Sequence, residues 1–91
     1  MSVNDIDWIE AIGHYMRLHV ANDSHILREG MTNLEAKLDP SKFVRIHRST
    51  IVNIDRIQDW KPLFSGECVL TLRNGVKLTV SRTYRPRLPE V

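Results

Sequence analysis

The sequence predicts a single, mainly β domain built from several small antiparallel sheets and one short helix. Short stretches of alternating apolar and polar residues recur along the chain, and they are rich in Val, Ile, Leu and Thr. Asn, Asp and Gly separate several of these stretches, as expected for tight turns. The 91 residues suffice for one modest core, and one segment has the apolar spacing that is typical of a helix.

Two strands are expected near the N-terminus. In residues 5–10, Ile6 and Trp8 fall on one side of a strand and Ile9 on the other. Residues 15–20 alternate cleanly, so methionine, leucine and valine share one face while tyrosine, arginine and histidine share the other.

A turn and a helix are expected next. Turn chemistry at residues 22–23 allows a returning strand at residues 25–28. The helix is predicted at about residues 32–38, because Thr32 and Glu35 have the spacing of a capping box. Two leucines four residues apart form its apolar stripe, and the proline that follows them ends it.

Residues 68–80 predict a second hairpin. A two-residue Asn-Gly turn would place leucines and polar residues on the same face of the sheet. A three-residue loop, residues 73–75, with Gly75 in the left-handed conformation pairs Leu72 with Val76 and keeps one face apolar. We therefore favour the three-residue loop.

The stretch FVRIHRSTIVNI, residues 43–54, has four consecutive polar residues inside a strand-forming run. If the alternation continued unbroken, Arg48 would point to the apolar side. Burying an unpaired arginine costs roughly several kcal/mol, which is a large part of the stability of a small domain. The strand should therefore break near residues 47–49 and resume at Thr50 or Ile51, so that the break forms an exposed loop.

The charge is unevenly distributed along the chain. Residues 1–41 carry three Lys or Arg against seven Asp or Glu, whereas residues 42–91 carry ten against four. A basic half favours a polyanionic partner, either nucleic acid or an anionic membrane face. A merely solvated basic surface is the alternative interpretation.

The sequence offers little for catalysis or metal binding. His47 and Ser49 are too close in sequence to form an oriented nucleophile–base pair without a third group. The four histidines lack metal-ligand spacing, and there is no Gly-rich phosphate loop. The single Cys68 suits a reducing cytoplasm, and no apolar run could span a bilayer. We expect a cytoplasmic, non-enzymatic domain without cofactor, metal or membrane contact.

Several segments occur in an order that is familiar from one family. They are Ile6–Ala11, Tyr15, Leu34-Glu35 with Leu38, Phe43–Asn53 and Leu78–Arg82. In this combination the chain resembles the LytTR DNA-binding domain over nearly its whole length. The phrase FVRIHRSTIVNI is specific, and the terminal Val-Ser-Arg is a second, independent anchor.

The resemblance implies a β sandwich-like fold of small stacked sheets. It also implies that loops, rather than a recognition helix, enter successive grooves of double-stranded DNA, with two copies of the domain on direct repeats. Such domains usually accompany a receiver or sensor domain in bacterial transcription regulators of the two-component type. Residues 1–91 are therefore expected to be one excised C-terminal effector domain, without the strand that usually comes first.

The resemblance also implies a set of contact residues. The first base contact falls on His14, Tyr15 or Met16, of which Met16 has the parity of a core residue. By the same resemblance, the other two base contacts fall on Arg48 and Arg82, at the position after the motif histidine and at the terminal Ser-Arg. Arginine forks suit guanine edges. The neighbouring polar side chains are expected to contact DNA phosphates, namely Arg17, Lys42, His47, Ser49, Ser81 and Thr83.

Structural roles are the alternatives for some of these residues. Arg48 can cap a neighbouring carbonyl, and His47 can shape its loop by hydrogen bonding to the backbone. Asn53 is interpreted as a hydrogen-bonding residue at the end of a strand. Trp8 and Trp60 are interpreted as core or rim packing.

Two other functions remain open from the sequence. A single-stranded nucleic-acid binder would need exposed aromatic residues in the basic half, whereas Phe43, Phe64 and Tyr84 are interpreted as structural. A signalling domain that binds protein or a small ligand would have basic loops that are merely solvated.

Overall fold

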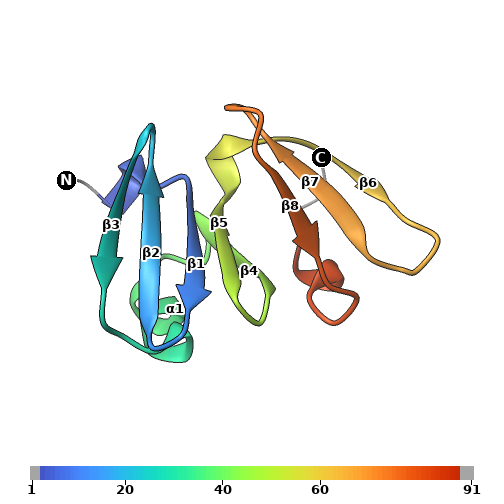
Figure 1. The fold of residues 1–91 in the computed structure, drawn as a ribbon. Helices are drawn as coiled ribbons and strands as arrows, with labels where there is room; N and C mark the ends of the chain where they lie inside the picture. Colours follow the sequence, from blue (N-terminus) through green and yellow to red (C-terminus); the bar gives the residue numbers. More distant parts are fainter. Residues whose placement is uncertain (1–2, 89–91) are drawn as a thin grey trace.

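The computed structural model describes residues 3–88, which form two antiparallel sheets and one short helix (Figure 1). The larger sheet has five strands in the order β3-β2-β1-β5-β4, and the smaller has three in the order β6-β7-β8. The mainly β class predicted from the sequence is confirmed. In chain order the elements are the 3-10 turn η1 Val3–Asp5, β1 Trp8–Ile12, β2 Tyr15–Val20, β3 Asp23–Leu27, α1 Met31–Lys37, β4 Phe43–His47, β5 Thr50–Asn53, η2 Ile54–Arg56, β6 Ile57–Pro62, β7 Cys68–Leu72, β8 Lys77–Val80 and η3 Arg85–Arg87.

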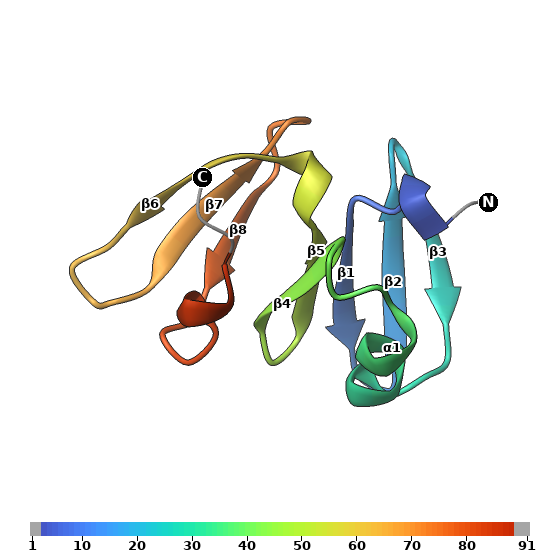
Figure 2. The same ribbon diagram turned by 180° about the vertical axis from the view of Figure 1, so that it is seen from behind.

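Helix α1 covers one face of the five-stranded sheet, as the view in Figure 2 shows. Alternate residues of β1 and β2 point to that face, where Ile9, Met16 and Leu18 are buried together with Leu34 of the helix. The alternation predicted for residues 15–20 is thereby confirmed.

The three-stranded sheet packs against β4 and β5, on the face of the larger sheet that α1 does not cover. One backbone hydrogen bond reinforces this contact. The Ser81 N–H donates to the Ile46 carbonyl at 2.9 Å, which ties the end of β8 to β4. The Arg73 N–H donates to the Arg56 carbonyl at 2.8 Å and extends the β6–β7 pairing by one residue. The buried side chains of this second core are Val44, Ile46, Val52, Cys68, Leu70, Leu72 and Val80.

Two predictions about turns are confirmed. The long strand-forming run breaks after His47 and resumes at Thr50. The hairpin of β7 and β8 has the three-residue loop, with Gly75 at a φ of +90° and the Leu72 N–H donating to the Val76 carbonyl at 2.8 Å. The remaining pairs of β7 and β8 follow in that register and keep one face apolar.

The phase predicted for the first strand is wrong. β1 begins at Trp8, and Ile6 lies before it, in the same core as Ile9. Trp8 packs instead against the core between the sheets. Alternation holds only within the strand, and Ile6 belongs to the segment that leaves η1, where its N–H donates to the Val3 carbonyl at 3.1 Å.

The first hairpin turn lies one residue earlier than predicted, at residues 21–22, so β3 is Asp23–Leu27. Ala21 has a φ of +53°, a conformation that costs a non-glycine residue about 1 kcal/mol. Its N–H donates to Asp7 Oδ2 at 3.1 Å. A buried carboxylate therefore stabilises a turn that the residue types alone do not favour.

The predicted capping box is also wrong. Helix α1 begins at Met31 with Gly30 at the N-cap, and no side chain caps it. The earlier start lets Met31 enter the core, and Thr32 lies exposed inside the helix. Glu35 does not reach back to the helix N-terminus, because its carboxylate accepts from Arg45 and from a second arginine.

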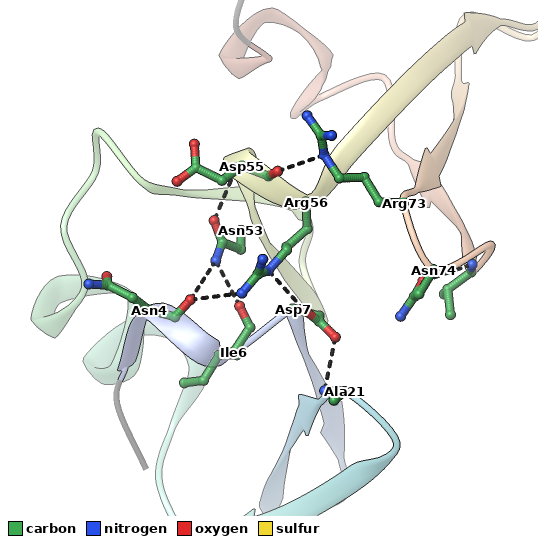
Figure 3. Close-up of polar contacts among 10 residues, drawn as sticks. Asn4, Ile6, Asp7, Ala21, Asn53, Asp55, Arg56, Arg73 and Asn74 are labelled. Carbon is green, nitrogen blue, oxygen red and sulfur yellow. Dashed lines mark hydrogen bonds and ion pairs between the residues drawn. The ribbon is translucent and has the colours of Figure 1, made fainter.

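A polar network joins the N-terminal segment to η2, as Figure 3 shows. Asn53 Nδ2 donates to the Ile6 carbonyl at 2.9 Å, and Asn53 Oδ1 accepts from the Asp55 N–H at 3.0 Å. Arg56 Nε lies 3.0 Å from Asp7 Oδ1. The strand-end role predicted for Asn53 is confirmed.

Candidate nucleic-acid interface

Three loops lie at one edge of the molecule, the lower edge in Figure 1. They are the β1–β2 turn at residues 13–14, the β4–β5 turn at residues 48–49, and residues 81–84 after β8. Antiparallel pairing places them together, because β1, β4 and β8 all end at this edge. We call these three segments the loop edge; the turns at residues 21–22 and 73–75 lie at the opposite edge.

The β4–β5 turn exposes Arg48, while the residues on either side of it, His47 and Ser49, hydrogen-bond to each other. The Ser49 N–H donates to His47 Nδ1 at 3.2 Å, and Ser49 Oγ lies 2.9 Å from the same nitrogen. The Ser49 carbonyl accepts from the Ala11 N–H at 2.9 Å, which ties the turn to β1. Within residues 3–88 no hydrogen bond or ion pair holds the Arg48 side chain, so it does not act as the carbonyl cap considered above.

The segment after β8 exposes Arg82 in a similar way. The Ser81 carbonyl accepts from the N–H groups of Tyr84 and Arg85, at 3.1 and 2.9 Å, and this closes a tight turn. The stem of Arg82 lies on Gly66, where an added Cβ would come within 2.6 Å of Arg82 Cδ. Gly66 also has a φ of +91°, so two constraints favour glycine there. No protein group in the described range 3–88 engages the guanidinium of Arg82 through a hydrogen bond or ion pair.

The β1–β2 turn presents the third set of predicted residues. Gly13 has a φ of +58°, as a tight turn requires. His14 and Tyr15 are exposed, with Tyr15 46% exposed, whereas Met16 is 3% exposed. Met16 therefore belongs to the core, and of the three alternatives only His14 and Tyr15 are accessible to a partner.

Two predicted phosphate contacts lie away from the loop edge. Lys42 precedes β4 at its far end, roughly 17 Å of strand from His47, and its Nζ is 3.5 Å from Asn4 Oδ1. Arg17 lies inside β2, and its Nη1 is 3.9 Å from Glu10 Oε1. Ser81 and Thr83, in contrast, flank Arg82 in its loop.

The interpretation of Phe64 as structural is wrong. Phe64 is fully exposed in the β6–β7 loop, and Leu63 beside it is 45% exposed. The same loop contains Gly66, against which Arg82 lies, so an exposed aromatic side chain is near the loop edge. The turn-forming Ser-Gly that follows Phe64 was the available signal. The interpretation of Phe43 as structural is confirmed by its burial.

The sequence analysis also missed Arg28. This exposed arginine lines an open groove together with Gly13 and His14, between the β1–β2 turn and the start of α1. Within residues 3–88 its side chain has no hydrogen-bond or ion-pair partner. Its position after an exposed edge strand gave no sequence signal for this placement.

Residues 3–88 contain no group of three or more His, Cys, Asp or Glu side chains that could hold a metal ion. In that range no helix has the length and apolar character needed to cross a membrane.

Away from the loop edge, the pKa of the Asp39 carboxyl is lowered, because the Ser41 hydroxyl and N–H both donate to it.

The fold and the loop edge define a β-type domain that presents basic side chains from loops rather than from a helix. The chain belongs to the LytTr DNA-binding domain family, whose model matches residues 1–91. The resemblance stated from the sequence is therefore confirmed. The family is non-enzymatic, as the sequence analysis expected.

The relatives are longer proteins. The chain is 29% identical to the sensory transduction protein LytT of Bacillus anthracis over all 91 residues, which are 37% of that protein. It is 34% identical to the transcriptional regulatory protein LytR of Staphylococcus aureus strain N315 over 67 residues, covering 74% of this chain and 27% of that protein. The chain thus spans about a third of the curated relatives that it matches.

A solved structure has the same fold. It is the LytTr DNA-binding domain of a putative methyl-accepting/DNA response regulator from Bacillus cereus. The TM-score is 0.88 at 23% identity, and the match covers 94% of this chain and 79% of that one. This similarity confirms the two-sheet architecture with one short helix.

Proposed function

We propose that this domain binds double-stranded DNA with sequence specificity by inserting its loops into successive grooves. The observation that supports this proposal most is the position of Arg48 and Arg82. They lie on two separate loops of one edge, and each has a guanidinium without a protein partner in residues 3–88. A guanidinium fork matches the two acceptors of a guanine edge in the major groove.

The remaining side chains of the loop edge divide into two roles. His14 and Tyr15 are exposed on the third loop and are assigned to base contacts. Ser81 and Thr83 flank Arg82, and their hydroxyls suit phosphate oxygens. Arg28 adds a cation beside His14 and is assigned to the phosphate backbone as well.

His47 and Ser49 are assigned mainly to the shape of the Arg48 turn. The imidazole Nδ1 and the Ser49 hydroxyl already contact each other at 2.9 Å, so neither group is fully free for a phosphate. Lys42 and Arg17 lie outside the loop edge and are not assigned to the interface.

The wider role follows from the relatives. Because LytT and LytR are named as sensory transduction and transcriptional regulatory proteins, we assign this domain to the output part of a bacterial two-component regulator. A receiver or sensor domain and a second copy on a direct repeat are its expected partners, and the cytoplasm is its expected compartment. One such domain has limited surface for tight specific binding, which favours two copies.

The test is a binding-site selection with randomised duplexes at two salt concentrations. We expect an enriched motif, together with an affinity that falls as salt rises because phosphate contacts release counterions. A steep salt dependence without any enriched motif would reduce the activity to non-specific attraction and would contradict the proposal.

One observation favours a second candidate, the binding of single-stranded nucleic acid. The exposed Phe64 and the half-exposed Tyr15 are aromatic rings on which bases could stack. Competition between the selected duplex and each of its separated strands distinguishes the two functions. Stronger competition by a single strand would replace our proposal with this candidate.

A further inference from the structure

Arg45 differs from Arg48 and Arg82, the two arginines of the neighbouring loops. It lies in β4, three residues before Arg48, and its side chain is only 12% exposed. Its basic character and its place before the turn suggest a phosphate contact, but its donors are directed inward.

The first contacts of Arg45 are with the turn itself. Its Nε donates to the His47 carbonyl at 3.3 Å, and its Nη2 donates to the Arg48 carbonyl at 2.5 Å. The pairing of β4 with β5 is irregular between Arg45 and His47, so the regular ladder is interrupted here. One guanidinium therefore holds two consecutive carbonyls at the tip from which Arg48 projects.

The second set of contacts reaches the neighbouring loop. The Arg45 guanidinium carbon lies 5.5 Å from the centre of the Tyr84 ring, and that of Arg87 lies 4.7 Å from the same ring. Tyr84 closes the turn that presents Arg82. A cation at this distance from an aromatic face is attracted to it.

Helix α1 completes the cluster. Glu35 Oε1 lies 3.4 Å from Arg45 Nη1, and Glu35 Oε2 lies 3.2 Å from Arg87 Nη1. The carboxylate neutralises part of the charge that two close arginines bring together. Arg45 thus contacts, through one planar group, the turn of Arg48, the turn of Arg82 and the helix.

We propose that Arg45 is a positioning residue that fixes the separation of the Arg48 and Arg82 loops, and with it the spacing of the base pairs that the domain distinguishes. This inference rests on the proposed function. Lysine at this position would keep the charge. It would lose the planar fork that spans two carbonyls and lies against the Tyr84 ring.

The experiment uses the selected duplex and two derivatives, with one base pair inserted or deleted between the positions that Arg48 and Arg82 contact. Those two positions are identified first. They are the base pairs at which the Arg48→Ala and Arg82→Ala variants, respectively, lose the base preference of the wild-type chain. The wild-type chain should bind both derivatives at least about tenfold more weakly than the original. For Arg45→Lys we expect this discrimination to fall below about threefold, with an unchanged salt slope.

The matched control is Arg73→Lys. Arg73 Nε also donates to a backbone carbonyl, that of Asp55 at 3.1 Å, but at the opposite edge. This variant should retain the wild-type preference for spacing. Thermal unfolding of all variants shows whether each is folded at the temperature of the binding assay.

A second pair of variants, at Tyr84, tests the same inference without changing Arg45. Tyr84→Phe keeps the ring and should behave as wild type, whereas Tyr84→Leu removes the aromatic face and should weaken the spacing preference as Arg45→Lys does. If Arg45→Lys does not fold, this pair decides the question alone.

Several outcomes would overturn the inference. A salt slope reduced by about one in Arg45→Lys, with the spacing preference intact, would make Arg45 a phosphate contact. An intact spacing preference in both Arg45→Lys and Tyr84→Leu would also reject it. If the wild-type chain enriches no motif, the proposed function fails and the inference with it, so the two failures are distinguishable.

Discussion

The loop edge and the opposite edge use arginine in different ways. At the loop edge, Arg48 and Arg82 have no hydrogen-bond or ion-pair partner for their side chains within residues 3–88. At the opposite edge, Arg56 faces a carboxylate at 3.0 Å and Arg73 donates to a carbonyl at 3.1 Å (Figure 3). Arg48 and Arg82 are therefore not engaged by protein groups at the loop edge, whereas Arg56 and Arg73 act as internal ties at the opposite edge.

This difference shows that the number of Lys and Arg residues in a segment overstates how many cationic side chains are available to a partner. Residues 42–91 carry ten Lys or Arg, but several of them are engaged inside the protein. Arg85 donates to the Gly66 carbonyl at 3.3 Å, and Arg45 and Arg87 share the carboxylate of Glu35. A partner is better inferred from the arginines that remain unengaged than from the net charge of the segment.

The largest effect on stability is expected from removing the hydrogen bonds of Asn53, at the opposite edge. Asn53→Ala should destabilise the fold by about 2–3 kcal/mol, because the Ile6 carbonyl and the Asp55 N–H lose their buried partner. Urea unfolding measures this change. Asn74→Ala, which removes one exposed turn bond to the Val76 N–H at 3.0 Å, should cost well under half as much. Equal costs would show that the network around Asn53 adds no more stability than one exposed turn bond.

The next largest effect is expected at the loop edge. Arg48→Ala and Arg82→Ala should each weaken binding to the selected duplex by about 1–3 kcal/mol and relax the preference at one base position. Titration against the duplex and its single-base variants measures both quantities. Arg73→Ala, at the opposite edge, should leave affinity unchanged. An equal loss on every sequence would mean that the arginine contacts only phosphate.

A smaller effect is expected at Gly66, which lies in the β6–β7 loop and contacts Arg82. Gly66→Ala should cost about 1 kcal/mol of stability because of its φ of +91°, and it should also weaken DNA binding severalfold because the new Cβ displaces Arg82. Gly75 is the matched control, since its φ is +90° and nothing lies within 4 Å of an added Cβ. Gly75→Ala should show the loss of stability without the loss of affinity. If both variants bind equally well, the contact between Gly66 and Arg82 has no role in binding.

The smallest effect is expected at Asp39. Because its pKa is lowered in the folded state, the Asp39 carboxylate stabilises the fold above its unfolded pKa, and this contribution is lost as the pH falls through the folded pKa, below about 4. Asp39→Asn should flatten the decline of the melting temperature as the pH is lowered below about 4. The Asp39 side chain is exposed, so the change should be small. A steeper decline in the variant would reverse the sign and reject this assignment.

Much of the fold could be predicted from local chemistry. The break at Arg48 follows from the cost of burying a guanidinium, and the loop at Gly75 follows from keeping one face of β7 and β8 apolar. The start of α1 could not be predicted, because the burial of Met31 depends on the sheet beneath the helix. The sequence likewise predicted that Glu35 would cap the helix with Thr32, whereas in the structure its carboxylate pairs with Arg45.

The site was predictable only in part for a related reason. Sequence proximity placed Lys42 next to the His47 turn, but a five-residue strand carries the chain from one edge to the other. Arg28 was missed for the opposite reason, since tertiary structure places it beside His14. Which end of a strand reaches a given edge depends on topology, and this information is not contained in a short motif.

The backbone hydrogen bond between Ser81 and Ile46 has a thermodynamic consequence. Neither sheet can separate from the other without breaking this bond and exposing the core that they share. The molecule should therefore melt in one cooperative transition, and the slowest-exchanging amides of both sheets should report the same free energy of opening.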